Sequence, residues 1–522
     1  MTFRFFNFWA SHPDFDRIVV GIWNTPMDGS RLFQVCKKLK CLKEKLKAFN
    51  GAHFRNLPNQ SSLARQSLLN IQRQLRFSPN DDTLRSLERE ALSVYTNACK
   101  AEESFHAQKF RIKWLKEGDS NTSFFHNSVK SRFNRNKLVS LALEDGSTIS
   151  DPVLIKEEAT TFFHSILNGS AAQPYPGKSF LSHYISKQIS RAHCESLIED
   201  ITSEEVKKAL FSIHPNKAPG PDGFNAFFFQ RVWHIIGDDL TVAIQAFFIS
   251  GHLLKEVNHA SISLVPKVLN PATLNDYRPI SCCKTIYKCI SKIMANRLKQ
   301  VLPNLIDEAQ SAFIQGRSIS DNIFMAQELL RNYHRKDTTS RCAIKVDIRR
   351  AFDTVQWDFL LDLLELLGFP PLFIHWIRAC ITTPKFSVNI NGELAGFFSS
   401  SRGIRQGDPL SPYLFVIAMD ALAMILQKNI SVADTFSYHW RCEATSTTHI
   451  CFADDLILFC GGSLHAANII KHSLDTFFSC YGMEANSSKS VVLVAGDNAS
   501  FREKVIALFG YSLGSLPIKH LY

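Results

Sequence analysis

The clearest hydrophobic pattern lies at residues 31–49, where apolar side chains recur every three or four positions. They are Leu32, Val35, Leu39, Leu42, Leu46 and Phe49. This spacing places one apolar face along an α-helix. Similar stripes predict helices over 61–76 and 82–111, so a helical hairpin or small bundle is the simplest assembly for this part of the chain.

Residues 1–30 have a different composition from the helical segment that follows. They carry Pro13, Gly21, Pro26 and Gly29 among several aromatic residues. Proline and glycine at such intervals interrupt regular structure. We therefore expect an irregular lead-in before the first long helix.

Farther along the chain, short apolar runs predict buried strands. These runs lie at 343–348, 386–390, 393–398, 449–452, 456–459 and 491–495. The pair Asn391-Gly392 favours a tight hairpin turn between two of them. Helices are expected at 204–213, 357–367, 413–427 and 463–480. Strands and helices alternate irregularly and hairpins recur, so the pattern predicts an α+β fold, not a doubly wound parallel sheet.

The positive charge of the chain is concentrated in one segment. The formal net charge is +11, and residues 31–140 alone hold 22 Lys and Arg against 9 Asp and Glu. The remainder is nearly balanced. A basic segment on a balanced body is typical of proteins that bind a polyanion. The lysines on the predicted helix 31–49 are equally compatible with a solvated helix face.

Composition also narrows the class of protein. The 13 cysteines are scattered and include no pair spaced as CxxC, which is typical of reduced thiols in an intracellular protein. No run of about 18 uninterrupted apolar residues occurs, so we expect no membrane span. The aromatic start of the chain is interrupted by Arg4 and Asn7 and is not a convincing signal peptide.

Two adjacent carboxylates stand out within an apolar context. Asp454 and Asp455 lie between the predicted strands 449–452 and 456–459. Acidic pairs favour turns, and most such pairs are simply solvated. A carboxylate held at the tip of a buried hairpin would instead require a counter-charge, for which a divalent cation is suited. Asp347, near the end of the strand 343–348, supplies a third acid in a similar context.

Basic and glycine-containing stretches offer further candidates, each with two interpretations. The loop 215–223 could hold a phosphate or turn the chain. Lys284, Lys288 and Lys292 recur every four residues and could form a basic ridge or a solvated face. Arg278 precedes the helix that carries them, where a phosphate is also favoured. The segment 113–126 could stack on a base or form a buried aromatic cluster.

Taken in order, these motifs resemble the reverse transcriptases of LINE-type non-LTR retrotransposons, most closely the plant L1-like lineage. The blocks that carry the resemblance are Asp276–Ser281, Ala351–Asp353, Arg405–Pro412 and Phe452–Asp455, with Trp114–Thr122, Lys217–Gly223 and Gly316–Asn322 upstream of or between them. The resemblance implies a right-hand polymerase with fingers and palm. It divides the chain into a lead-in at 1–30, a basic helical segment at 31–140, an extension at 141–249 and fingers with palm at 250–522.

The resemblance also implies roles for particular residues. Asp347, Asp454 and Asp455 would hold two Mg²⁺ ions, or Mn²⁺, for nucleotidyl transfer. The other residues implied are Lys267 and Arg278 at the triphosphate, Gln406 and Gly407 against the templating pair, Lys489 at the leaving pyrophosphate, and Phe352 beneath the sugar of the incoming nucleotide. An aromatic residue at that position selects deoxynucleotides in the family.

The implied partners are an RNA template, a DNA primer and deoxynucleoside triphosphates, and the implied location is nuclear. Full elements of this family carry an endonuclease before the polymerase, and a primer grip and thumb after it. We expect this chain to lack the endonuclease, the primer grip and the thumb. We therefore expect it to polymerise poorly. Two alternatives stay open: a non-catalytic nucleic-acid-binding remnant of a retroelement, and a relative of group II intron maturases or telomerase.

Overall fold

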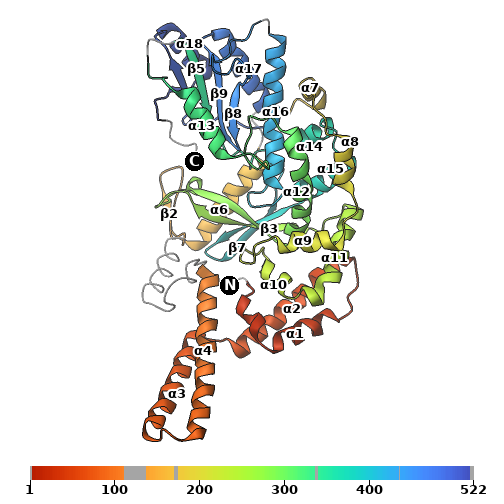
Figure 1. The fold of residues 1–522 in the computed structure, drawn as a ribbon, viewed down its shortest axis with the longest axis vertical. Coiled ribbons are helices and arrows are strands. Elements are labelled where there is room, and N and C mark those ends of the chain that lie inside the picture. The colour runs from red at the N-terminus through yellow and green to blue at the C-terminus, as the bar shows by residue number, and fades with distance from the viewer. Residues whose placement is uncertain (1–2, 111–136, 170–173, 336–338, 434, 518–522) are drawn as a thin grey trace.

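The computed structural model describes residues 3–110, 137–169, 174–335, 339–433 and 435–517, and these form an elongated molecule (Figure 1). The motif Trp114–Thr122 lies outside the described residues. The prediction of a fold that mixes helices with mainly antiparallel sheets is confirmed.

The helices are α1 (Asp14–Trp23), α2 (Arg31–His53), α3 (Leu57–Phe77), α4 (Asp82–Phe110), α6 (Pro152–Asn168), α7 (Lys178–Ser182), α8 (Arg191–Ile198), α9 (Ser203–Phe211), α10 (Ala226–Arg231), α11 (Trp233–Ser250), α12 (Thr285–Leu305), α13 (Ile319–Leu330), α14 (Trp357–Leu366), α15 (Pro371–Thr382), α16 (Ser411–Val432), α17 (Leu464–Tyr481) and α18 (Ala499–Phe509), with 3-10 turns η1 (Asn7–Ser11) and η3 (Leu274–Asp276). The strands are β1 (Leu141–Ala142), β2 (Thr148–Ile149), β3 (His259–Pro266), β4 (Tyr277–Cys283), β5 (Arg341–Val346), β6 (Lys385–Ile390), β7 (Glu393–Ser399), β8 (His449–Phe452), β9 (Asp455–Gly461), β10 (Val491–Ala495) and β11 (Ser512–Leu513).

A five-stranded sheet in the order β11-β10-β5-β9-β8 forms one end of the molecule, at the top of Figure 1. Alternate residues of β5 and β9 enter two different hydrophobic clusters. Ile344 and Leu458 face the main core, whereas Ala343 and Phe459 face a smaller cluster that includes α13 residues. Both faces of the sheet are therefore buried, which explains why β9 is a nearly continuous apolar run and why even Arg341 and Lys345 of β5 are buried.

A four-stranded sheet in the order β4-β3-β6-β7 lies in the middle of the molecule. Strand β3 pairs antiparallel with β4 and parallel with β6. The β6–β7 hairpin turns at Asn391 and Gly392, whose φ angles are +53° and +92°. Two positive φ values in succession match the turn predicted from this residue pair.

The interpretation of residues 1–30 as irregular is wrong. They form η1 and α1, and Phe5, Trp9 and Phe15 are buried in the main core. The backbone N–H of Phe5 donates to the carbonyl of Gly223 at 2.9 Å. A segment this short has no stripe long enough to reveal a helix, so only the tertiary contacts show that its aromatic residues are core residues.

The predicted helices of residues 31–111 are confirmed as α2, α3 and α4. The apolar stripe of α2 packs mainly on α11 and α1, and Lys37 and Lys40 on its other side are exposed. Helices α3 and α4 form a hairpin that projects from the lower end of the molecule (Figure 1). This region thus combines a docked basic helix with a protruding arm.

Helix α16 runs lengthwise beside the five-stranded sheet, from the upper end of the molecule toward its middle (Figure 1). By length and composition alone it is apolar enough to span a membrane, but 67% of the qualifying window is buried inside the protein. It packs against α12, α14 and α17. Its apolar character is therefore explained by its place in the core.

Candidate active site

The two adjacent carboxylates lie at the tip of the β8–β9 hairpin. Phe452 pairs with Asp455, so Ala453 and Asp454 form a two-residue turn and Asp455 begins β9. The sequence prediction of both acids in the turn is thus correct for Asp454 only. Ala453 has a φ of +57°, a left-handed conformation that is unfavourable for a residue with a Cβ atom.

Asp347 lies beside this hairpin because of the register of the sheet. The last paired residues of β5 and β9 are Val346 and Leu456, and continuing that register by one residue sets Asp347 opposite Asp455. The backbone N–H of Asp347 donates to Ser490 Oγ at 3.1 Å, and its carbonyl accepts from the Asn486 N–H at 2.8 Å. The sheet and the loop before β10 therefore fix the position of this acid.

The electrostatics show that the acids share one site. The pKa of Asp454 is raised, chiefly because the surrounding protein removes hydration from the carboxylate, and further because Asp347 adds negative charge. Arg278 opposes this shift but does not cancel it. Like charges brought together in this way favour binding of a cation.

The tip of the hairpin is held by a segment that the sequence analysis did not connect with it. Gln310 is buried, accepts from the N–H of Ala453 at 3.1 Å and donates to Cys451 Sγ at 3.1 Å. Asn322 donates to the carbonyl of Cys451 at 2.8 Å. Arg317 donates to the carbonyl of Gln310 at 2.6 Å. The motif Gly316–Asn322 thus acts on the acids through their supporting strand.

Basic residues form a cluster, and its member Arg278 acts electrostatically on Asp454. Lys267, Arg278 and Lys489 are all exposed. The pKa of Lys267 is lowered, first because the surrounding protein removes part of the hydration of its ammonium group and then by the positive charges of Lys489, Arg278 and Arg350. The residues predicted at the triphosphate and at the pyrophosphate therefore lie near one another. Arg350, which the sequence analysis did not single out, belongs to the same cluster.

Phe352 and the glycine-containing loop are held by contacts with Phe415 and with β4. The ring of Phe352 stacks on Phe415 with centroids 4.3 Å apart and planes at 11°. The carbonyl of Gln406 accepts from the Ser281 N–H at 2.7 Å. Gly407 has a φ of +101°, and a Cβ there would lie 3.0 Å from the carbonyl oxygen of Ser281. Only glycine lets the loop approach β4 this closely.

Asp353 is a further acid next to this loop. Gln406 Nε2 lies 3.4 and 3.3 Å from its two carboxylate oxygens. Burial raises the pKa of Asp353 to about 7, against the opposing charges of Arg350 and Lys267. The side-chain amide of Gln406 is therefore held by a carboxyl group that titrates near neutral pH.

Arg405 and Asp408, in the motif Arg405–Pro412, make contacts inside the protein. Arg405 is buried, pairs with Asp408 at 3.1 Å and donates to Asn258 Oδ1 at 2.6 Å. Its guanidinium lies over the ring of Tyr287 at 3.9 Å, and the Tyr287 hydroxyl donates to Asp408 at 2.6 Å. This network joins the loop 402–410 to α12 and to the start of β3.

Two sequence interpretations need correction. Lys284 and Lys288 are buried, so they form neither a basic ridge nor a solvated face. Lys288 donates to the carbonyl of Ala218 at 2.6 Å. A Cβ at Gly220 would lie 2.5 Å from the backbone nitrogen of Lys284. The loop 215–223 therefore packs on the start of α12, and its glycine serves that close approach.

Comparisons with known proteins agree with this geometry. Residues 265–513 match the family described as reverse transcriptase (RNA-dependent DNA polymerase). The chain is 30% identical over 321 residues to a Xenopus laevis protein named "Transposon TX1 uncharacterized 149 kDa protein". The matched region covers 62% of this chain and 24% of that protein. It is 25% identical over 371 residues to the Pol polyprotein of the retrotransposable element R2DM of Drosophila melanogaster, covering 68% of this chain and 34% of that protein.

A third relative is named as an enzyme. The chain is 26% identical over 227 residues to the "RNA-directed DNA polymerase from mobile element jockey" of Drosophila funebris, covering 42% of this chain and 24% of that protein. The chain thus spans about a quarter to a third of the length of these curated relatives.

Proposed function

We propose that the chain, whose residues 265–513 match the reverse transcriptase family, is an RNA-directed DNA polymerase of a non-LTR retroelement. The observation that carries the proposal is the convergence of Asp347 with the Asp454-Asp455 hairpin. The five-stranded sheet is then the palm, and the sheet β4-β3-β6-β7 the fingers. The plant L1-like lineage stays a prediction from the sequence motifs.

The donor set fits divalent cations. The mutual repulsion of Asp347 and Asp454 is the situation that a hard divalent ion relieves, and Mg²⁺ prefers carboxylates together with substrate phosphates. In the proposed function Asp347, Asp454 and Asp455 hold two Mg²⁺ ions, which Mn²⁺ could replace. Bound there, such ions supply charge stabilisation for the attacking and leaving oxygens of phosphoryl transfer.

The protein's own residues orient the substrates. Lys267 and Arg278 bring positive charge to the triphosphate of a deoxynucleotide, and Lys489 brings it to the leaving pyrophosphate. All three are exposed and close to one another, as contact with a solvated polyanion requires. Gln406 and Gly407 present backbone and amide groups to the templating pair, beside the Gln406–Asp353 contact.

Phe352 supplies selection for the sugar in this proposal. Its ring is held flat against Phe415, so it cannot easily move aside. A rigid aromatic ring beneath the sugar would exclude a 2′-hydroxyl by contact. Deoxynucleotides would then be preferred because the site has no space for the 2′-hydroxyl of a ribonucleotide. The absence of a hydrogen-bond partner for that hydroxyl would not be the cause.

The basic helical segment supplies the surface for the template and primer in this proposal. Lys37 and Lys40 of α2 are exposed, and residues 31–140 carry most of the excess positive charge. An RNA template and a DNA primer are both polyanions, so this charge favours their binding. Because the substrates of a retroelement polymerase include chromosomal DNA, we also propose a nuclear location.

Primer extension tests the proposal. The chain is given poly(A) RNA, an oligo(dT) primer, dTTP and Mg²⁺, beside a variant with Asp454→Ala and Asp455→Ala. We expect extension by the wild type and a loss of more than about a hundredfold in the variant, because charge stabilisation in the transition state is removed. A folded wild type that binds the duplex without extending the primer would favour the non-catalytic nucleic-acid-binding alternative.

A further inference from the structure

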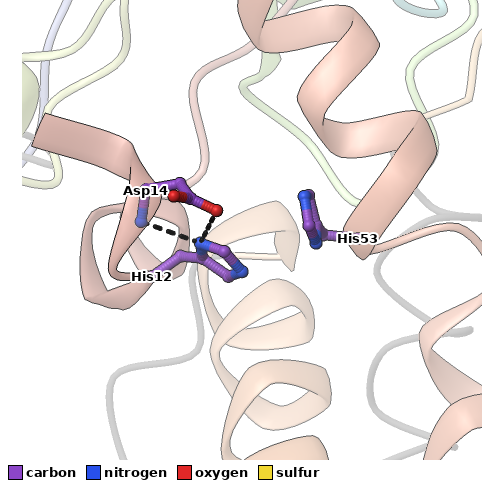
Figure 2. Close-up of side chains that lie close together, drawn as sticks. All are labelled: His12, Asp14 and His53. Atoms are coloured by element: carbon purple, nitrogen blue, oxygen red, sulfur yellow. Dashed lines mark hydrogen bonds and ion pairs between the residues drawn. The ribbon is translucent and has the colours of Figure 1, made fainter. Parts of the chain in front are cut away.

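A cluster of potential metal ligands lies far along the chain from the carboxylate site. His12 ends the turn after η1, Asp14 begins α1, and His53 is the last residue of α2. Figure 2 shows the three side chains converging from two separate segments. One ligand atom from each lies within 4.8 Å of the others, and the two imidazole rings are 4.5 Å apart between centroids.

We propose that His12, Asp14 and His53 bind one divalent transition-metal ion, with Zn²⁺ as the ion best suited to these donors. Two imidazoles and one carboxylate are typical ligands of zinc, whereas Mg²⁺ and Ca²⁺ prefer oxygen ligands alone. Three protein ligands leave a fourth position for water. The site joins the start of α1 to the end of α2.

The carboxylate of Asp14 is already oriented by an ion pair. Arg17 forms an ion pair with Asp14 Oδ1 at 2.9 Å. The other oxygen, Oδ2, lies 3.9 Å from His12 Nδ1 and faces the cluster. A guanidinium on one carboxylate oxygen fixes the orientation of the other, as second-shell partners do at metal sites.

The rings are also held by packing. His12 meets Phe49 edge to face at a centroid distance of 5.0 Å, and Phe49 contacts His53 at 4.9 Å. Phe54 closes the other side of His12 at 6.0 Å. Phe49 is buried, so the aromatic wall is part of the core. The imidazoles therefore start near each other instead of being collected from solvent.

Binding requires a small rearrangement. Nitrogen ligands lie about 2.0–2.1 Å from Zn²⁺, so donors now separated by up to 4.8 Å must draw together by roughly an ångström. His53 is exposed and can rotate. The N–H of Asp14 now donates to His12 Nδ1 at 3.2 Å. Giving up that hydrogen bond is a small loss beside the free energy of zinc binding.

A metal ion bound at this site would restrain the basic helical segment. Helix α3 begins only four residues after His53, and Asn56 between them has a φ of +62°. Fixing the end of α2 to the start of α1 fixes this corner, from which the α3–α4 arm projects (Figure 1). The ion would thus set the orientation of the arm relative to the exposed lysines of α2.

Cobalt binding tests the proposal without any assay of activity. Co²⁺ is titrated into the whole chain in excess Mg²⁺, which occupies oxygen-only sites, and visible absorption is recorded. We expect one Co²⁺ per chain with the intense bands of four-coordinate nitrogen and oxygen ligation, displaced by Zn²⁺. His53→Ala and Asp14→Asn should each weaken binding by more than about a hundredfold, because removing a ligand exceeds the effect of losing a second-shell partner.

The matched control is His465→Ala, which removes an exposed histidine of α17 at the other end of the molecule (Figure 1) and should leave the titration unchanged. Asp14→Asn preserves the shape of the side chain, so a folding defect in one variant does not decide the outcome. Equal cobalt affinity in the wild type, His53→Ala and Asp14→Asn would overturn the proposal, as would a wild type that binds no Co²⁺ in excess Mg²⁺.

Discussion

At the scale of single residues, the site combines acids whose surroundings differ. Asp454 is exposed at a hairpin tip, while Asp353 lies under the loop 402–410, where burial raises its pKa to about 7. Asp454 faces another acid, whereas Asp353 faces the Gln406 amide. The first environment favours a metal ion, and the second makes protonation of Asp353 sensitive to pH near neutrality.

The raised pKa of Asp353 predicts a specific dependence of stability on pH. An ordinary aspartate has a pKa of 3.8, whereas folded Asp353 has one of about 7. Between these values the unfolded chain releases a proton that the folded chain retains, so this group's contribution to stability falls as pH rises. Asn cannot titrate. We therefore expect the unfolding free energy of Asp353→Asn, minus that of the wild type, to increase from pH 4 to pH 7.

Denaturant unfolding at several pH values measures this difference. Asp358→Asn, at an exposed position on α14, controls for the change in net charge. A difference between Asp353→Asn and the wild type that stays flat across the window would show that Asp353 is not held protonated in the folded chain.

Phe352 allows a test of substrate selection. Phe352→Val should raise the incorporation of ribonucleotides relative to deoxynucleotides by about tenfold or more, because a steric block is removed. It should also lower stability by about 1–3 kcal/mol, since part of the stacked ring is lost. Primer extension with dTTP or UTP measures the ratio.

The control for Phe352→Val is Phe415→Leu, which removes the stacking partner and keeps the ring of Phe352. It should lower stability while leaving discrimination nearer to that of the wild type. Equal discrimination in the wild type and Phe352→Val would assign Phe352 to the core alone.

At the scale of elements, the β8–β9 hairpin depends on a segment that precedes it by more than a hundred residues. The carbonyl of Ala309 accepts from the Cys451 N–H, and Ser311 donates to the Cys451 carbonyl. Gln310 between them reaches the turn itself. The short bridge covers the edge of β8 and supports the unfavourable conformation of Ala453.

Gln310→Ala should destabilise this hairpin. It leaves the half-buried N–H of Ala453 without its acceptor, which costs up to about 1–3 kcal/mol. We expect faster amide hydrogen exchange in residues 449–456 and reduced polymerisation, with exchange in β6 and β7 unchanged. Gln315→Ala, at an exposed position in the same segment, is the matched control. Unchanged amide hydrogen exchange in residues 449–456 would mean that Gln310 does not stabilise the hairpin.

The sequence predicts the elements of the hairpin well and its support poorly. Apolar runs around Asp454 and before Asp347 indicate strands because both sheet faces are buried. The amide of Gln310 contacts a residue 141 positions away, and no local pattern encodes that distance. For the same reason the chain around Phe5 was interpreted as irregular, whereas its partners come from residues 223–228.

At the scale of the whole molecule, the excess positive charge and the acids of the candidate active site lie in different parts of the structure. The acids lie in the five-stranded sheet at one end, while α2 and the α3–α4 arm lie toward the other (Figure 1). Composition alone shows only that residues 31–140 of the sequence hold the excess charge, not where they lie in space. It does not predict that α2 docks on α11, which leaves only part of its lysines exposed.

The exposed lysines of α2 should contribute to nucleic-acid binding through phosphates. Lys37→Gln and Lys40→Gln should each weaken binding of an RNA–DNA duplex and reduce the slope of log affinity against log salt by about 1. Lys504→Gln, at an exposed position on α18 at the opposite end, is the control. Salt slopes equal to that of the wild type in both α2 variants would place the binding surface elsewhere.

The central claim is that Asp347 and the Asp454-Asp455 hairpin hold metal ions together, and cleavage by bound iron tests it most directly. Fe²⁺ replaces Mg²⁺ at carboxylate sites, and with peroxide and ascorbate it cuts the chain beside its ligands. We predict cuts near residues 347 and 454 in the same sample, suppressed by excess Mg²⁺ and lost in Asp347→Asn. A folded chain cut at neither position, or cut equally in Asp347→Asn, would contradict the account.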